Sequence, residues 1–308
     1  MNSKERIVGD FLKAHNLNVP EAFNEDLDGI HWLINIKSAI DEELKVRASR
    51  LLEEKEPTWA ITLSMLDRVY ELIAGGFISL FSGAWASVEI VCRASLEATI
   101  NVVYVLESDT GNRLSQYMTH YFEGSSKSID RYESLINATA GGSKADVSSA
   151  TEARRMLAWR RETIEAIFQQ EGIPFGVGGW PKQIFERFKA LGREFEYREI
   201  YASLSSQVHN DADALIDFMI FKSLEANVPD ASEKFGAEVF FWLRHFLYRS
   251  LEFYSEAAEL YATKYSLAEA KTNIEKERSS LGARLRHINK GYLQLRDASG
   301  KPPGTAGS

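Results

Sequence analysis

Residues 77–106 are mostly apolar and small, yet they carry a regular row of polar side chains. Glu89, Arg93, Glu97 and Asn101 stand four residues apart. A four-residue step turns about 400° around a helix, so the first three spread over about 80° of one face. Burying a charge is costly unless it is paired, and a charge at bilayer depth is costlier still. We therefore expect a buried central helix, not a membrane span, whose polar row meets partners elsewhere in the fold.

Apolar residues recur at helical spacing along nearly the whole chain, while alternating strand patterns are scarce. The predicted fold class is all-α, a multi-helix bundle with long central buried helices and no sheet. Gly75 and Gly76 predict a kink or break before the polar helix. Ser266 is the expected cap of the last helix. The expected helices cover residues 3–14, 28–56, 58–74, 77–107, 112–138, 149–171, 181–191, 195–222, 232–261 and 266–296.

No compositional break demands a domain boundary. We expect one helical domain over residues 1–296, or alternatively flanking helices 1–56 and 232–296 packed on a core 57–222. Residues 297–308, rich in Gly, Pro and Ser, are expected to be a disordered tail. The predicted helix 232–261 holds more aromatic residues than one face needs, which indicates either burial on several sides or a dimer surface.

The composition limits the cellular compartments and the binding partners to be expected. The 308 residues include 36 Lys and Arg against 44 Asp and Glu, a net charge of −8, which argues against an overall affinity for nucleic acid or anionic lipid and leaves room for a local basic patch. Cys92 is the single cysteine, so no internal disulfide forms and a reducing compartment is expected. The N-terminal residues lack the pattern of a signal peptide. We expect a cytoplasmic protein with no membrane partner.

A second polar row follows the same four-residue step: Tyr201, Ser205, His209 and Asp213. A neutral His209 beside a carboxylate is suited to general acid or base chemistry, or to metal binding together with Asp213. The alternative is a core histidine bonded across the bundle. The Glu-x-x-His pairs of di-iron bundles are absent, so neither a metal nor another cofactor is expected.

Two interpretations of Arg93 stay open at this point. In the structural one, Glu89 and Glu97 lie within reach along the helix and neutralise it. In the functional one, its planar guanidinium binds a phosphate or carboxylate of a ligand.

The segments Arg93-Ala-Ser-Leu-Glu97 and Tyr201-Ala-Ser-Leu-Ser-Ser-Gln-Val-His209 carry a resemblance. They are similar to two landmark segments of an uncharacterised all-helical bacterial family, a domain of unknown function, over about residues 64–222. The resemblance implies that both segments meet in one site. That family in turn resembles the HEPN bundles, many of them dimeric ribonucleases of toxin and antiviral systems with an Arg five residues before a His. Leu204 stands at that position here, so Arg93 or Arg198 would have to substitute.

The leading hypothesis is a homodimeric bundle whose polar pocket binds a nucleotide or an RNA phosphate, with metal-independent RNA cleavage as an extension. Arg93 would bind phosphate and His209 would be the acid or base, with Glu97 and Asp213 orienting them. The other expected ligand-binding residues are Tyr201, Ser205, Glu89 and Asn101. The rival is a non-catalytic interaction or sensor module, with an unknown protein partner, in which the two rows only fix helix register.

Overall fold

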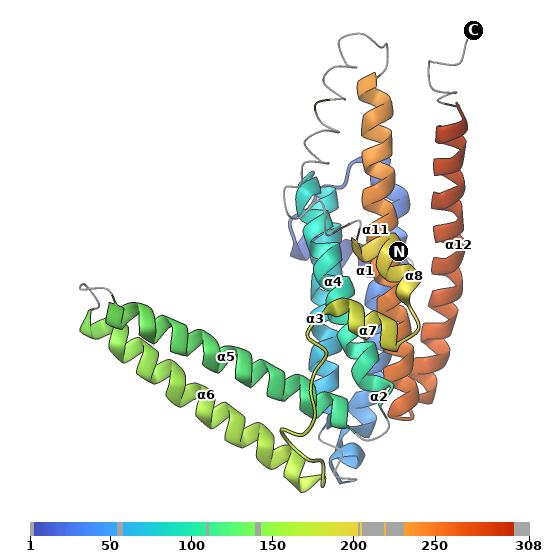
Figure 1. Ribbon diagram of the computed structural model, residues 1–308. Coiled ribbons are helices and arrows are strands. Elements are labelled where there is room, and N and C mark those ends of the chain that lie inside the picture. Colours follow the sequence, from blue (N-terminus) through green and yellow to red (C-terminus); the bar gives the residue numbers. More distant parts are fainter. Residues whose placement is uncertain are drawn as a thin grey trace.

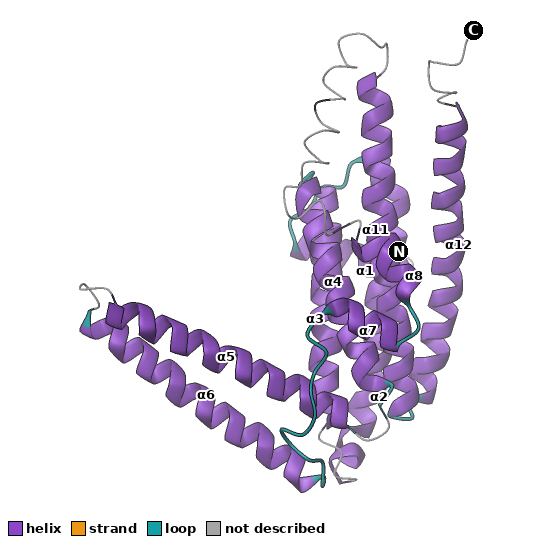
Figure 2. Ribbon diagram, in the orientation of Figure 1, coloured by secondary structure: helices purple, strands orange, loops and turns teal. Residues whose placement is uncertain are grey.

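A computed structural model describes residues 3–53, 58–108, 111–138, 143–202, 204, 219 and 231–298. Within these ranges the secondary structure is helical and no residue is assigned to a strand, which confirms the all-α prediction (Figure 2). No helix in the same ranges combines the length and the apolar character that crossing a membrane requires.

The helices follow one another with short connections. In chain order they are α1 (Ser3–Ala14), the 3₁₀ helix η1 (Glu21–Asp26), α2 (Leu27–Glu53), α3 (Thr58–Phe81), α4 (Trp85–Leu106), α5 (Asn112–Ala138), α6 (Lys144–Gln170), α7 (Ile184–Ala190), α8 (Glu194–Glu196), the π-helical turn η2 (Tyr197–Tyr201), α11 (Ala231–Lys264) and α12 (Ala268–Ala298).

Two parts of the molecule stand out in Figure 1. Helices α2, α3, α4, α11 and α12 pack lengthwise as a bundle, and the short α7 lies on the outside of α4. Helices α5 and α6 form an antiparallel hairpin that projects away from the bundle and joins it only at its base (Figure 1). A long loop returns from the hairpin to α7, so the hairpin and α7 meet the bundle on the same side of α4.

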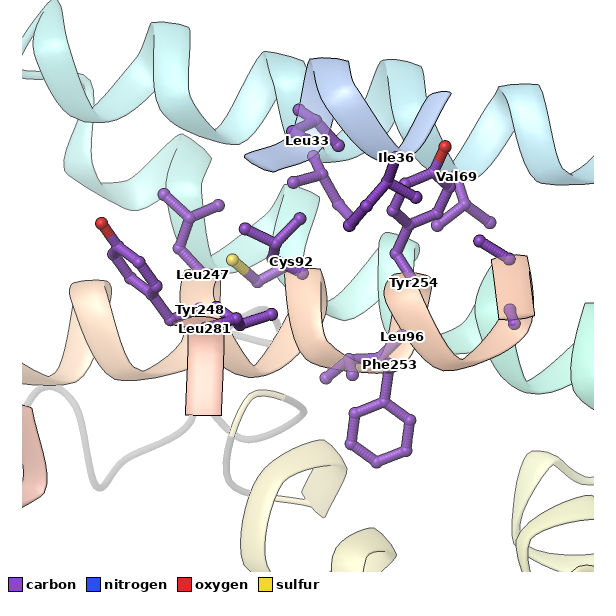
Figure 3. Close-up of a cluster of buried hydrophobic side chains, with 14 of the residues drawn as sticks. Leu33, Ile36, Val69, Cys92, Leu96, Leu247, Tyr248, Phe253, Tyr254 and Leu281 are labelled. Carbon is purple, nitrogen blue, oxygen red and sulfur yellow. The ribbon is translucent and has the colours of Figure 1, made fainter. Parts of the chain in front are cut away.

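The core sits between the five bundle helices. One buried cluster includes Leu33 and Ile36 of α2, Leu96 of α4, and Leu247 and Tyr254 of α11, all with 1% or less of their surface exposed (Figure 3). Burial of such side chains drives folding at about 25 cal/mol per Å² of apolar surface. The long apolar stretches of the sequence therefore become helices that are covered on several sides.

Cys92 belongs to this core. Its thiol is buried, and the burial raises its pKa to about 12 (Figure 3). A thiol held in its neutral form is a poor nucleophile, so Cys92 behaves as a small apolar side chain.

The sequence predicts a kink or a break at Gly75–Gly76, and the break is wrong, because α3 runs through both glycines and ends at Phe81. A Cβ at Gly76 would lie 2.7 Å from Leu247 Cδ1. This glycine therefore serves the close approach of α3 and α11. The chain turns instead at Gly83, whose φ of +76° is the left-handed conformation that glycine adopts without strain.

Other helix limits also differ from expectation. Helix α6 begins at Lys144 rather than near residue 149, because Ser143 and Asp146 form a reciprocal capping box. Ser266 does not cap the last helix: it adopts a φ of +56°, and Glu43 of α2 accepts the Ala270 N–H at 2.8 Å instead. Helix α12 also extends to residue 298, two residues into the expected tail. Residues 299–308 lie outside the described part of the chain.

The aromatic residues of α11 are largely used inside the bundle. Phe246, Tyr248, Phe253 and Tyr254 have at most 3% of their surface exposed. Of the two interpretations offered for this helix, burial on several sides therefore holds for these four. The aromatic character of α11 thus gives no separate indication of a dimer surface at these positions.

Candidate functional site

The polar row of α4 lies at the edge of the core rather than through it, since Glu89, Arg93, Glu97 and Asn101 are all half-buried. Among the described residues the carboxylate with no exposed surface is Asp26, which accepts from Arg244 Nε at 2.9 Å. The deepest charge pair therefore joins η1 to α11. The row on α4 faces the segments that pack on the outside of the bundle.

Glu97 is the centre of the candidate site. Its Oε2 accepts a hydrogen bond from the Tyr201 hydroxyl at 3.1 Å, across 104 positions of sequence. The Tyr201 side chain comes from the π-helical turn η2 and is 4% exposed. Arg93, one turn before Glu97, places its guanidinium 5.4 Å from the centre of the Tyr201 ring, a cation–π distance. The structure thus places Arg93, Glu97 and Tyr201 next to one another.

Arg187 of α7 completes the group on the other side of Glu97. Its Nη2 lies 3.7 Å from Glu97 Oε1, and its Nη1 donates to the Pro181 carbonyl at 2.7 Å. The Arg187 side chain is 5% exposed, against 45% for that of Glu97. The carboxylate therefore connects a buried arginine with solvent, and together with the half-buried Arg93 it forms the accessible part of this group.

Trp180 holds Arg187 in place. The guanidinium lies 5.3 Å from the centre of the indole, whose ring also meets Tyr104 of α4 and Tyr117 of α5 edge-on at 5.3 and 5.0 Å. Such edge contacts suit the opposite charge of aromatic edges and faces. Arg187 is therefore positioned by α4 and by the base of the hairpin together.

The local sequence explains how α7 delivers this arginine. The preceding loop turns at Gly176 and Gly178, both with left-handed φ, and a Cβ at Gly178 would meet Gln116 Nε2 at 2.5 Å. Gln183 and Glu186 then form a capping box that starts α7. This glycine-containing loop thus fixes one wall of the site.

Burial and the neighbouring charges tune the ionisable groups. Burial raises the pKa of Tyr201. A hydrogen bond with Arg93 lowers this pKa, and the negative charge of Glu97 raises it further. Burial lowers the pKa of Arg187, and Glu97 gives the largest opposing contribution. Burial also raises the pKa of Glu89. At neutral pH the Tyr201 phenol is thus a neutral hydrogen-bond donor to Glu97.

Two buried polar atoms in this region have no hydrogen-bond partner among the described residues, namely Arg187 Nε and Asn101 Oδ1. Buried polar atoms are normally satisfied by protein, water or a ligand. One atom is a donor and the other an acceptor, so they offer complementary contacts. Asn101 lies one turn beyond Glu97 on α4, as the predicted row requires.

The remaining predicted residues fall elsewhere. Ser205, His209 and Asp213 lie outside the described part of the chain, so the meeting of the two rows beyond Tyr201 stays a prediction. Leu204, at the position where HEPN proteins carry the arginine, is fully buried in the core. Arg198, one of its two suggested substitutes, is exposed.

Sequence reasoning missed Arg187 and Trp180. The signal available was the Trp-Pro step followed by a Gln-x-x-Glu capping pattern, which predicts a helix start and places Arg187 one turn inside it. Nothing in the sequence pairs that helix with α4. The contact depends on the loop geometry, which spacing does not reveal.

Comparison with known proteins gives one match. Residues 60–226, more than half of the chain, match the model of a family described as Family of unknown function (DUF5677). No curated protein and no solved structure matches the chain. The matched segment begins in α3 and contains Arg93, Glu97, Arg187 and Tyr201.

Proposed function

We propose that this chain, which belongs to the family of unknown function DUF5677, binds a phosphate-bearing ligand, a nucleotide or RNA, on the outer face of α4. The observation that carries the proposal is the convergence of Arg93 and Arg187 on the Glu97–Tyr201 pair. Arg187 is buried and already bonded, so it acts as fixed positive charge. Arg93 is half-buried, so it is the more accessible of the two arginines.

In this proposal Arg93 binds the phosphate, a role that suits its planar array of donors. The Tyr201 ring under the guanidinium limits its rotation, which lowers the entropy lost on binding. Glu97 offsets part of the positive charge and orients the tyrosine hydroxyl. Tyr117, which is half-buried, belongs to the same wall and gives it aromatic character, a property that sites for nucleobases share.

Cleavage of RNA is the further part of the proposal, and it depends on His209. The resemblance to HEPN bundles assigns this residue the role of general acid or base without a metal. RNA cleavage that persists in EDTA and is lost in His209→Ala would support it. Binding that is unaffected by His209→Ala, with no cleavage by the wild type, would leave a binding protein.

The experiment for binding compares the wild type with Arg93→Ala, using fluorescence anisotropy of a labelled short RNA and thermal shifts with nucleotides. One lost charged hydrogen bond corresponds to about 10- to 100-fold weaker binding. Arg68→Ala is the matched control, because Arg68 on α3 is exposed and pairs only locally with Glu71. Equal binding by Arg93→Ala and the wild type would refute the proposal.

A second candidate is an interaction or sensor module in which this group is structural. It is favoured by the engagement of both Glu97 oxygens, one by Tyr201 and one by Arg187. It predicts that Arg93→Ala lowers the free energy of unfolding while no nucleotide or RNA raises the melting temperature of the wild type. The two candidates thus differ in the ligand-dependent shift of the wild type itself.

A further inference from the structure

The hairpin of α5 and α6 exposes apolar side chains far from the site on α4. Tyr121, Tyr132 and Leu135 of α5 are 48%, 43% and 65% exposed. At 100° per residue, these three and Ser128 fall within about 60° of one another around the helix. No charged residue of α5 falls within this stripe, and its Tyr132 hydroxyl also donates to Asp146 of α6 at 3.4 Å. We call this stripe the α5 face.

We infer that the α5 face is the contact between two copies of this chain, which pair through their hairpins in antiparallel fashion. A two-fold axis at Ser128 sets Tyr121 opposite the partner's Leu135, and Tyr132 opposite the partner's Gly124. Large side chains thus meet at both ends of the stripe and small ones at its centre. A contact of this kind is self-complementary, as a two-fold interface requires.

Gly124 has no conformational reason to be glycine. It lies inside α5 with helical geometry, and a Cβ there would meet nothing within 4 Å. A glycine inside a helix costs about 1 kcal/mol relative to alanine, and it leaves room for a side chain of another copy to approach closely. The partner's Tyr132 is the group that the two-fold pairing brings there.

Charge favours the hairpin over the rest of the molecule as a contact between copies. Of the chain's 36 Lys and Arg and 44 Asp and Glu, residues 112–170 hold eight and seven. The hairpin therefore has a net charge of +1, while the whole chain carries −8. Two acidic bodies repel each other, and the projecting hairpin lets two copies touch where the charge is balanced.

The size of the face suits a contact that depends on concentration. A 27-residue helix such as α5 is about 40 Å long, and one helix presents a face about 10 Å wide. This gives about 400 Å² per copy, the size of a weak or transient interface rather than of a permanent one.

Sedimentation of the full chain at concentrations from 1 to about 100 μM tests the proposal. We expect the wild type and Trp159→Glu to be dimers, and Tyr121→Glu to be a monomer with unchanged helix content. Trp159 is the matched control, because it is an aromatic residue of α6 that is 57% exposed and lies outside the α5 face. A monomeric wild type, or a dimer that survives Tyr121→Glu, would overturn the proposal.

Crosslinking gives an independent readout that does not depend on weakening the contact. The native Cys92 is buried, so a new surface cysteine reacts alone. With a short thiol-to-thiol crosslinker, Ser128→Cys should form covalent dimers, whereas Ser134→Cys, on the opposite face of α5, should not. Equal yields from both variants would contradict the placement of the two-fold axis at Ser128.

Discussion

The hydroxyl of Tyr201 donates to Glu97 at 3.1 Å, and this single bond joins η2 to the middle of α4. Tyr201→Phe removes the donor and keeps the ring. Because Glu97 is half-exposed and regains water, we expect a loss of about 1 kcal/mol in the free energy of unfolding. Urea unfolding of Tyr201→Phe, Glu97→Gln and the double variant measures the coupling of the pair. Fully additive effects would show that the bond contributes nothing.

Arg187 should be far more sensitive to substitution than an exposed arginine. Arg187→Lys keeps the charge but removes the planar contact with Trp180. A lysine also cannot bond the Pro181 carbonyl and pair with Glu97 in the geometry of the guanidinium. We expect a loss of about 1–3 kcal/mol, measured by urea unfolding. In the control Arg155→Lys, where the side chain is 70% exposed and bonded to Glu152, the unfolding free energy should stay the same. Equal losses would mean that the buried contacts are unimportant.

Glycine-to-alanine changes should have opposite effects at two helical positions. A Cβ at Gly29 would lie 2.4 Å from the buried ring of Phe77, whereas one at Gly9 would meet nothing within 4 Å. Gly29→Ala should therefore destabilise the fold by about 1–3 kcal/mol through overpacking. Gly9→Ala should stabilise it by up to about 1 kcal/mol through helix propensity. Differential scanning calorimetry distinguishes the two, and a stabilised Gly29→Ala would contradict the packing of α2 against α3.

His245 should make the contact between α11 and α12 weaken in acid. Its Nδ1 bonds Asn289 Oδ1 at 3.0 Å, and burial lowers its pKa in the folded protein below the usual 6.5. The unfolded chain then binds a proton at a higher pH than the folded one, so this residue's stabilisation is complete above about pH 6.5 and falls as the pH drops toward the folded pKa.

The expected size of this effect is at most about 1.4 kcal/mol per pH unit. Urea unfolding of the wild type and His245→Gln between pH 7.5 and 5 isolates it, because glutamine does not titrate. The wild type should lose more stability than the variant over this range. Parallel curves for the two proteins would show that His245 does not sense pH.

The sequence predicts the helices of this fold well because their apolar residues repeat with the helical period. It fails at Gly75–Gly76, where a local breaker signal is overridden by the packing of Leu247 from a segment some 170 positions away. It fails again at Ser266, because the helix start is capped by Glu43 of α2 rather than by its own neighbour. Both errors arise from contacts that are distant in sequence.

In the candidate site, too, periodic residues could be predicted and residues that depend on distant contacts could not. Arg93, Glu97 and Tyr201 were found because each belongs to a periodic polar row, and periodicity is visible in one sequence. Arg187 belongs to no row and reaches Glu97 through a glycine-rich loop that no spacing rule can trace. The buried Asp26 escaped for a similar reason, since its partner Arg244 lies 218 positions away.

Trp180 has one consequence that concerns the whole molecule. Its ring touches Tyr117 of the hairpin on one side and Arg187 of the site on the other. If hairpin pairing shifts this indole, the affinity of the site must change, and by thermodynamic linkage a ligand must change the dimer dissociation constant by the same factor. Through Trp180, the fraction of dimer would then depend on whether the site on α4, which lies away from the dimer contact, holds a ligand.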